Sequence, residues 1–262
     1  MEWGALAMTV IRSVIFAAVF YGWSALLSPI YVPFMLLPRR GFWFMAWLWV
    51  RSCLILVEFV AGIRYEVRGR GNLPPGPFII ASKHQSAWDT LIYNKLFPDC
   101  AYVLKRELFW FPFFGWFLWR VGMVAIDRSG GAKALKSMVR QVRDRLAAGR
   151  VIVIFPQGTR TAPGTERPYL PGVSALYTQS LAPVVPVALN SGMFWPRRRF
   201  LKRPGTIVLE FLPPVPPGLP RREFERVLRE RIEPATRRLE AEAAARYGLE
   251  APPAAADAIR NI

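Results

Sequence analysis

A histidine and an aspartate at close spacing are the residues of this sequence best suited to do chemistry. The stretch IIASKHQSAWDTL (79–91) contains His84, the only histidine in the chain, and Asp89. An apolar run precedes them, so we expect a strand to deliver His84 to a strand-to-helix turn, where open α/β sheets expose ligand sites. A carboxylate there can fix the imidazole tautomer and stabilise the cation formed when the ring takes a proton. The spacing therefore predicts a general base with its orienting acid.

The same residues also fit a purely structural interpretation. Ser86 followed by Asp89 matches the S-x-x-D pattern that caps a helix. The two roles are compatible, because a carboxylate has two oxygens. Lys83 and the positive end of the helix dipole are both expected to disfavour imidazolium, which keeps the ring in the neutral form that a base requires.

An internal nucleophile does not accompany this pair. GVSAL (172–176) lacks the last glycine of the G-x-S-x-G pattern, and neither Cys53 nor Cys100 lies near His84 in the sequence. The proton is therefore expected to come from a substrate hydroxyl. The two cysteines also fit no metal, redox or disulfide spacing, which agrees with a cytosolic domain.

Two further turns carry positive charge, and the first is FPQGTR (155–160). Gly158 lets backbone N–H groups approach an anion, Thr159 offers a hydroxyl, and Arg160 can hold a phosphate through two hydrogen bonds. The P-loop pattern is absent, so nucleotide hydrolysis is not indicated. An ordinary turn with an exposed arginine is the alternative.

The second basic turn lies within residues 105–128. Lys105 and Arg106 follow one predicted strand, and Asp127 with Arg128 ends the next; three tryptophans and five phenylalanines lie between them. These aromatic residues suit a core or interfacial helix, an apolar floor for acyl chains, or a surface that rests on lipid. The sequence leaves these alternatives open.

The elements that must position these turns begin at residue 64. The length of 262 residues fits one α/β domain with extensions. Strand-like runs alternate with helix-like segments, which predicts a mixed sheet of about seven strands with surrounding helices. An amphipathic helix is expected over 132–148, ended by Gly149. The predicted strands are 65–69, 78–82, 102–104, 123–127, 151–155, 184–189 and 206–211.

The C-terminal part follows a proline-rich break, LPPVPPGLP (212–220). Beyond it, a charged helix is predicted over 221–248, broken or kinked near Pro234, and a disordered tail over 251–262. The chain therefore divides into three expected parts: hydrophobic membrane-anchoring helices (1–63), a catalytic domain (64–217), and a charged helix with a flexible tail (218–262).

Two apolar runs open the chain. Residues 13–37 carry no charge, and residues 41–63 are interrupted only by Arg51 and Glu58. Each run is long enough for a hydrocarbon core of ~30 Å. Both exceed the apolar region of about 7–15 residues in a secretory signal peptide, so we expect both to be retained. A buried core helix is the alternative for the second run.

The topology of these runs favours a hairpin in one leaflet. Two full spans would place Arg39 and Arg40 on the non-cytoplasmic side, against the positive-inside tendency. Pro29 and Pro33 would also interrupt the first helix. The tryptophans expected near the headgroups are Trp43, Trp47 and Trp49. The basic residues that place the remainder on the cytoplasmic face of the cell membrane are Arg64, Arg68 and Arg70.

The net charge of +17 suits nucleic acid, anionic lipid headgroups or an anionic substrate. Beside two apolar runs, an anionic membrane surface is the simplest partner. A basic cluster, WPRRRFLKR (195–203), falls in a predicted loop, but no nucleic-acid-binding motif accompanies it. We therefore expect no nucleic-acid partner.

Four stretches together resemble the glycerolipid acyltransferase family, particularly its bacterial 1-acylglycerol-3-phosphate acyltransferases. HQSAWD matches the H-x4-D motif of the family, and FPQGTR is similar to its F-P-E-G-T-R block. KRELFWFPFFG with IDR resembles the second block, and VVPVALNSG (184–192) the fourth. The four blocks occur in the order typical of the family, between residues 83 and 192.

The resemblance implies that His84, oriented by Asp89, activates the free hydroxyl of 1-acyl-sn-glycerol-3-phosphate (lysophosphatidic acid). This hydroxyl would attack the thioester of an acyl carrier protein or acyl-CoA and give phosphatidic acid for phospholipid synthesis. The resemblance implies no metal and no cofactor, and an α/β domain with an N-terminal hydrophobic helical element on the membrane. The implied substrate-binding residues are Lys105, Arg128, Gly158, Thr159, Arg160 and Pro186.

Two positions depart from the family pattern. Gln157 replaces the usual glutamate, and Lys83 stands where asparagine is common. Any role that needs a carboxylate at position 157 is lost. Either change can reflect another lysolipid acceptor. A non-catalytic protein that binds anionic membranes is the alternative from a different functional class.

Overall fold

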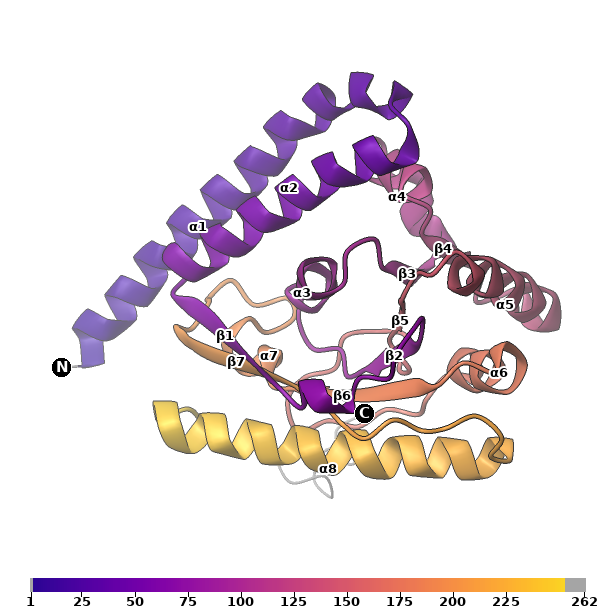
Figure 1. Ribbon diagram of the computed structural model, residues 1–262. Coiled ribbons are helices and arrows are strands. Elements are labelled where there is room, and N and C mark those ends of the chain that lie inside the picture. The colour runs from indigo at the N-terminus through magenta and orange to yellow at the C-terminus, as the bar shows by residue number, and fades with distance from the viewer. Residues whose placement is uncertain (1, 253–262) are drawn as a thin grey trace.

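The computed structural model describes residues 2–252, and its strands and helices alternate as predicted (Figure 1). Most of the predicted C-terminal tail lies outside these residues. The strands are β1 (Ile63–Arg68), β2 (Ile79–Ser82), β3 (Ala101–Lys105), β4 (Val124–Ile126), β5 (Ile152–Ile154), β6 (Val184–Leu189) and β7 (Gly205–Phe211). The helices are α1 (Glu2–Tyr31), α2 (Arg39–Phe59), α3 (Asp89–Leu96), α4 (Phe114–Arg120), α5 (Gly131–Ala147), α6 (Pro171–Ser180), α7 (Ser191–Phe194) and α8 (Arg221–Tyr247).

The seven strands form one mixed sheet in the order β1-β7-β6-β2-β5-β3-β4, which confirms the predicted fold class. The five neighbouring strands from β6 to β4 are parallel, whereas β7 runs antiparallel to β6 and parallel to β1. Parallel strands present their carboxyl ends at one edge of a sheet. The turns that follow β2, β3, β4 and β5 therefore share that edge, and these are the four turns with the predicted site residues.

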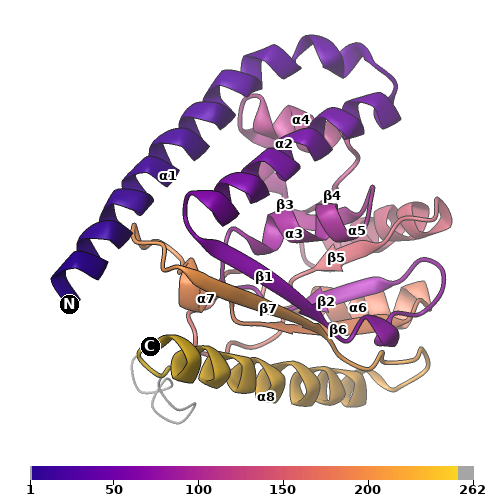
Figure 2. The ribbon, with the colours of Figure 1, turned by 60° about the vertical axis from the view of Figure 1, so that its left-hand side comes forward.

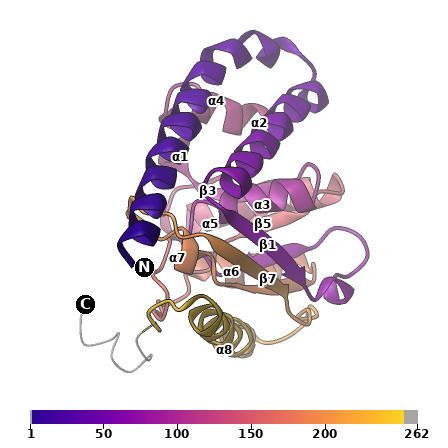
Figure 3. The same ribbon diagram turned by 90° about the vertical axis from the view of Figure 1, so that its left-hand side faces the viewer.

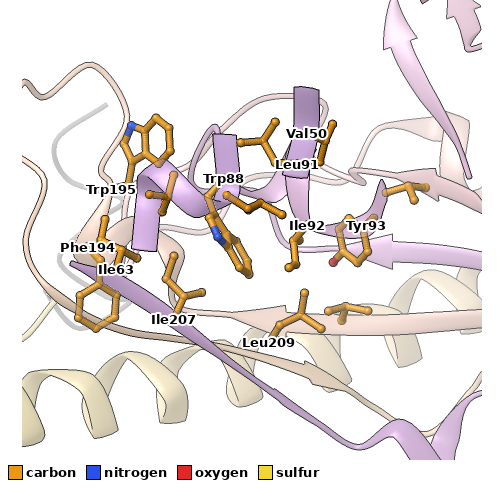
Figure 4. Close-up of a cluster of buried hydrophobic side chains, with 14 of the residues drawn as sticks. Val50, Ile63, Trp88, Leu91, Ile92, Tyr93, Phe194, Trp195, Ile207 and Leu209 are labelled. Atoms are coloured by element: carbon orange, nitrogen blue, oxygen red, sulfur yellow. The ribbon is translucent and has the colours of Figure 1, made fainter. Parts of the chain in front are cut away.

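Helices cover both faces of the sheet (Figure 2). The central strands are buried on both sides and consist of apolar residues, as expected for parallel strands between helices. Ile79 and Ala81 of β2 face the cluster that contains α5, α6 and most of the apolar face of α8. Ile80, between them, faces α2 and α3 on the other side. Figure 4 shows this second cluster, in which Trp88 and its neighbours on α3 lie over β7.

Helix α8 continues through Pro234, contrary to the predicted break. The proline removes one backbone donor, but apolar residues on both sides of it pack beneath the sheet, and Ile232 and Leu239 are fully or almost fully buried. Near the start of the helix, Phe224 stacks on Tyr177 of α6 with ring centroids 3.8 Å apart. Tertiary packing therefore compensates for the lost hydrogen bond.

Helices α1 and α2 form an antiparallel hairpin on the opposite side of the sheet from α8 (Figure 3). Both are long and apolar enough to cross a membrane, by length and composition. Most of their apolar surface is not covered by the protein. Pro29 does not interrupt α1, since it lies in the last turn of the helix and removes only one hydrogen bond there; Pro33 instead opens a short 3-10 turn.

The hairpin is tied to the rest of the protein at its tip. Arg39 makes a bidentate ion pair with Asp99, with N···O distances of 2.6 and 2.7 Å, and Asp99 lies just before β3. Arg120 of α4 donates to the Met35 carbonyl at 2.8 Å. Trp49, one of the tryptophans expected near the headgroups, donates its indole N–H to Ser24 of α1 at 3.2 Å and so joins the two helices.

Candidate active site

His84 and Asp89 lie in direct contact at the carboxyl end of β2. Nδ1 of His84 is 2.8 Å from Oδ2 of Asp89, the Asp89 side chain is fully buried, and 12% of the His84 side chain is exposed. The same Oδ2 accepts the backbone N–H groups of Gln85 at 2.7 Å and Ser86 at 2.9 Å. One carboxylate oxygen therefore makes both the backbone contacts of the capping interpretation and the imidazole contact of the catalytic interpretation. Oδ1 has no hydrogen-bond partner among the residues that the structure describes.

The predicted cap at Ser86 is only partly realised. Helix α3 begins at Asp89, and the Ser86 hydroxyl accepts the N–H of Trp88 at 3.2 Å instead of an N–H of the helix. Asp89 supplies the other half of the capping pattern by accepting the Ser86 N–H. The residues between His84 and Asp89 thus form a tight turn before the helix.

A ring that the sequence analysis did not single out supports the histidine. Phe155, at the end of β5, stacks on the imidazole with ring centroids 3.9 Å apart and 15° between the planes. Thr161 donates two hydrogen bonds to the His84 carbonyl, one from its backbone N–H at 2.8 Å and one from its hydroxyl at 3.2 Å. The signal for this contact is present in the sequence, since Phe155 opens FPQGTR directly after a strand that pairs with β2.

The FPQGTR turn meets the guanidinium group of Arg128. Gly158 has φ of +65°, and a Cβ at this position would lie 2.4 Å from Leu170 and 3.2 Å from Arg128. Glycine is therefore required by conformation and by space. Gly158 and Arg128 both line a cavity of about 170 Å³. Partial burial lowers the pKa of Arg128, the charge of Glu107 opposes this shift, and no carboxylate lies in ion-pair contact with Arg128 among residues 2–252. This desolvated cation is suited to an anion.

The remaining predicted binding residues are placed unequally. Arg160 and Thr159 are half-buried in the same turn, and the Arg160 carbonyl accepts a hydrogen bond from Arg197 at 2.9 Å. Lys105 lies at the same edge but is half-exposed and pairs with Glu107 at 3.1 Å.

Pro186 lies elsewhere. It is buried in the middle of β6, opposite Ala81, and its carbonyl accepts the N–H of Leu212 at 2.9 Å. This position within the sheet does not support a direct substrate contact. The proline instead belongs to the junction between β6 and the end of β7.

Lys83, which was expected to influence the neighbouring imidazole, is paired with a carboxylate of another helix. Its side chain is 2% exposed and pairs with Glu233 of α8 at 2.7 Å. Successive residues of an extended segment point to opposite sides, so Lys83 points toward α8 while His84 points to the other side. Glu233, and not the imidazole, is therefore the group that the Lys83 ammonium contacts.

Cys100 is not poised to act as a nucleophile. Burial raises the pKa of its thiol to about 12, because the thiolate would lose its hydration. The thiolate is the reactive form of cysteine, and very little of it exists near neutral pH. Cys100 therefore offers no alternative nucleophile to the His84–Asp89 pair.

An apolar cavity of about 400 Å³ lies between the hairpin and α3, α4 and β3. Thr90 and Leu91, directly after Asp89, form part of its wall, and Ala46 and Trp49 of α2 form another. The aromatic segment of the second basic turn serves two surfaces, since Phe117 and Leu118 line this cavity while other rings point outward. The outward rings are Trp110, Phe111, Trp116 and Trp119, and Phe114 is both exposed and part of the cavity wall.

Comparisons with known proteins agree with this geometry. The family model described as Acyltransferase matches residues 64–190, which contain every residue of the edge described above. A 1-acyl-sn-glycerol-3-phosphate acyltransferase from Pseudomonas aeruginosa is 41% identical over 202 residues, covering 76% of this chain and 77% of its own. The chain belongs to the acyltransferase family. This acyltransferase is also 32% identical to human 1-acyl-sn-glycerol-3-phosphate acyltransferase alpha over 205 residues, covering 77% of this chain and 72% of the human one.

A solved structure shares the fold. The crystal structure of the 1-acyl-sn-glycerophosphate acyltransferase PlsC from Thermotoga maritima superposes with a TM-score of 0.67 at 20% identity. The match covers 93% of this chain and 98% of that one, so it includes the two apolar helices as well as the sheet. The chain is therefore an enzyme of the acyltransferase class with the architecture of that structure.

We expect Asp89→Asn to lower kcat on the order of 10⁴-fold while the protein stays folded. An amide oxygen can still accept hydrogen bonds, but it has no charge to stabilise the imidazolium formed during proton transfer. Initial rates of acyl transfer and circular dichroism of the same samples test this. Asp144→Asn, on the exposed side of α5, is the matched control. Wild-type kcat in Asp89→Asn would rule out the orienting role.

Proposed function

We propose that the enzyme transfers a fatty acyl group from a thioester, carried by acyl carrier protein or coenzyme A, to the free hydroxyl of 1-acyl-sn-glycerol-3-phosphate. The product is phosphatidic acid, an intermediate of phospholipid synthesis. The observation that carries the proposal is the 2.8 Å contact between His84 and Asp89 at the edge where the basic turns meet. The names of the relatives from Pseudomonas aeruginosa and human support this acceptor.

Proton transfer begins at the outer nitrogen of the imidazole. An ionised Asp89 only accepts hydrogen bonds, so Nδ1 carries the proton and Nε2 keeps its lone pair. Nε2 removes the proton of the acceptor hydroxyl as the oxygen attacks the thioester carbonyl carbon. The tetrahedral intermediate then collapses, the C–S bond breaks, and His84 returns the proton to the departing sulfur. Phe155 stacks on one face of the ring and restricts its rotation during both transfers.

The acceptor phosphate binds beside FPQGTR in this proposal. Arg160 and Arg128 lie in this turn and beside it, and Gly158 leaves room for an anion to approach the backbone. Arg128 makes no ion pair within 4 Å among the described residues, although the charge of Glu107 acts on it. Guanidinium groups suit phosphate because they donate paired, coplanar hydrogen bonds. Lys105 adds charge at the rim, although Glu107 already neutralises part of it.

The cavity of about 400 Å³ is the proposed site for an acyl chain. Thr90 and Leu91, which follow Asp89 in the sequence, line this cavity, so an acyl chain inside it would lie on the side of the imidazole's partner. An alkyl chain that enters leaves water and gains about 0.8 kcal/mol for each buried CH₂ group. The cavity also opens beside the two apolar helices, from which a lipid substrate can enter.

The hairpin is proposed to insert into one leaflet, with the catalytic part on the cytoplasmic face. The pair between Arg39 and Asp99 keeps the hairpin tip next to the catalytic part, which disfavours a tip on the far side of the bilayer. The exposed aromatic rings of α4 extend this apolar surface.

The basic loop 195–203 supports contact with anionic lipid. It packs along α1, where Trp195 meets Phe16 edge to face at 5.1 Å and the Lys202 N–H donates to Ser13 at 2.9 Å. Basic residues beside a membrane-bound helix attract anionic headgroups, at about 1 kcal/mol for each residue.

His84→Ala is expected to abolish acyl transfer without changing folding or membrane binding. The alanine variant retains the sheet and the hairpin but has no group to accept the hydroxyl proton. Purified protein in detergent would be assayed with several lysolipids against thioesters of acyl carrier protein and coenzyme A. Retained transfer by the variant would end the proposed mechanism, and a wild-type preference for another lysolipid would end the proposed acceptor.

Arg160→Ala should raise the apparent KM for 1-acyl-sn-glycerol-3-phosphate by about 10- to 100-fold, because a charge-assisted contact contributes roughly 1.5–3 kcal/mol. The effect on kcat should be smaller. Steady-state kinetics at varied acceptor concentration measure both quantities. Arg222→Ala, at the exposed start of α8, is the control. An unchanged KM in Arg160→Ala would move the phosphate away from this turn.

Ala46→Phe should shift the acyl preference toward shorter chains. The added ring occupies part of the apolar cavity, so long chains lose the space while short chains keep it. Competition between thioesters of different chain length, followed by mass spectrometry of the product, measures the shift. Ala18→Phe, on the exposed side of α1, should leave the preference unchanged. Equal profiles for both variants would place the acyl chain elsewhere.

A further inference from the structure

We infer that Glu233 and Glu240 of α8 are positioning residues that hold the two motif turns together around His84. The inference rests on the proposed role of His84 and adds residues that lie outside the four sequence motifs. Both glutamates come from the C-terminal helix, about 40 residues after the last motif ends at residue 192, and their side chains lie on one face two helical turns apart. Both are almost completely buried.

The residues on either side of His84 reach these glutamates. Lys83 donates to Glu233 at 2.7 Å, and the Gln85 amide donates to Glu240. Since alternate residues of an extended segment point the same way, Lys83 and Gln85 both face α8 while His84 faces the opposite side. The backbone that carries the imidazole is therefore fixed on both sides of the catalytic residue.

Each glutamate also holds the segment that follows FPQGTR. Glu233 accepts the Tyr169 hydroxyl at 2.8 Å and the Gln157 amide at 3.3 Å. Glu240 accepts the Gly164 N–H at 3.0 Å, and burial raises the pKa of Glu240 because the charged form loses solvent. Each carboxylate thus joins the turn after β2 to the turn after β5.

The charges of this cluster explain why it is more than packing. Lys83 and Glu233 are 2% and 4% exposed, and a buried ion is tolerated only when it is paired and hydrogen-bonded. Gln157 is neutral at a position where the acyltransferase family usually has glutamate. The carboxylate that pairs with Lys83 is instead Glu233 of α8. The Gln157 Oε1 atom is buried and has no hydrogen-bond partner within residues 2–252.

The test exchanges the acid and the amide across their hydrogen bond. In Gln157→Glu/Glu233→Gln, the charge balance with Lys83 is unchanged, and the new Gln amide donates to the new carboxylate. Glu233→Gln alone removes the carboxylate that Lys83 contacts and leaves only the more distant Glu240 as a counter-charge, and Gln157→Glu alone places two carboxylates together. Each single variant should lower kcat by about 10- to 100-fold, since small misplacements of a catalytic group cost about this much. The KM for the acceptor should change less than about twofold.

Kinetics of the four proteins decide the inference. The inference is supported if the kcat of the exchange variant is at least about fivefold above the kcat of each single variant. A single variant that fails to fold counts as inactive in this comparison. Glu230→Gln, on the same helix but 58% exposed, is the matched control and should behave as wild type. The inference fails if Glu233→Gln keeps wild-type kcat, or if the exchange variant is no better than the single variants.

His84→Ala in the same assay separates this inference from the proposed function. An inactive His84→Ala beside a fully active Glu233→Gln overturns only the positioning role. An active His84→Ala overturns the proposed function itself.

Discussion

A single buried carboxylate oxygen organises the site. Oδ2 of Asp89 accepts two backbone N–H groups and the imidazole Nδ1, so one atom shapes the turn and orients the ring. A carboxylate removed from water is costly unless donors replace its hydration, and three donors converge here. Among residues 2–252, Nδ1 is the ring nitrogen of His84 that these contacts engage, and Nε2 makes no hydrogen bond. Backbone conformation and chemical role therefore depend on the same hydrogen bonds.

The parallel part of the sheet converts separate sequence blocks into one site. Because β2, β3, β4 and β5 end at a common edge, turns more than 70 residues apart in the sequence meet there. Phe155 stacks on His84, and Arg128 lies against Gly158, as direct results of this arrangement. Helix α8 closes the arrangement from below the sheet, where its buried glutamates meet the residues beside His84.

The apolar hairpin packs against the helix that follows the H-x4-D turn. The hairpin rests on α3, the helix that begins at Asp89, and the cavity between them is almost entirely apolar. The pair between Arg39 and Asp99 holds the hairpin tip in place. The protein thus offers an apolar cavity as well as basic turns, and the proposed acceptor has both an alkyl chain and a phosphate group.

Local patterns in the sequence determined the seven strands, the two apolar helices, and the H-x4-D and FPQGTR turns, because periodicity and turn chemistry act over a few residues. Only the tertiary structure decided which distant groups meet. Lys83 pairs with Glu233, which lies 150 positions later in the sequence. Pro186 lies inside the sheet, although it belongs to one of the four sequence blocks that resemble the family. Pro234 likewise stays helical because packing outweighs the local preference. Such contacts depend on the order of strands and on how helices cover them, which short-range patterns do not specify.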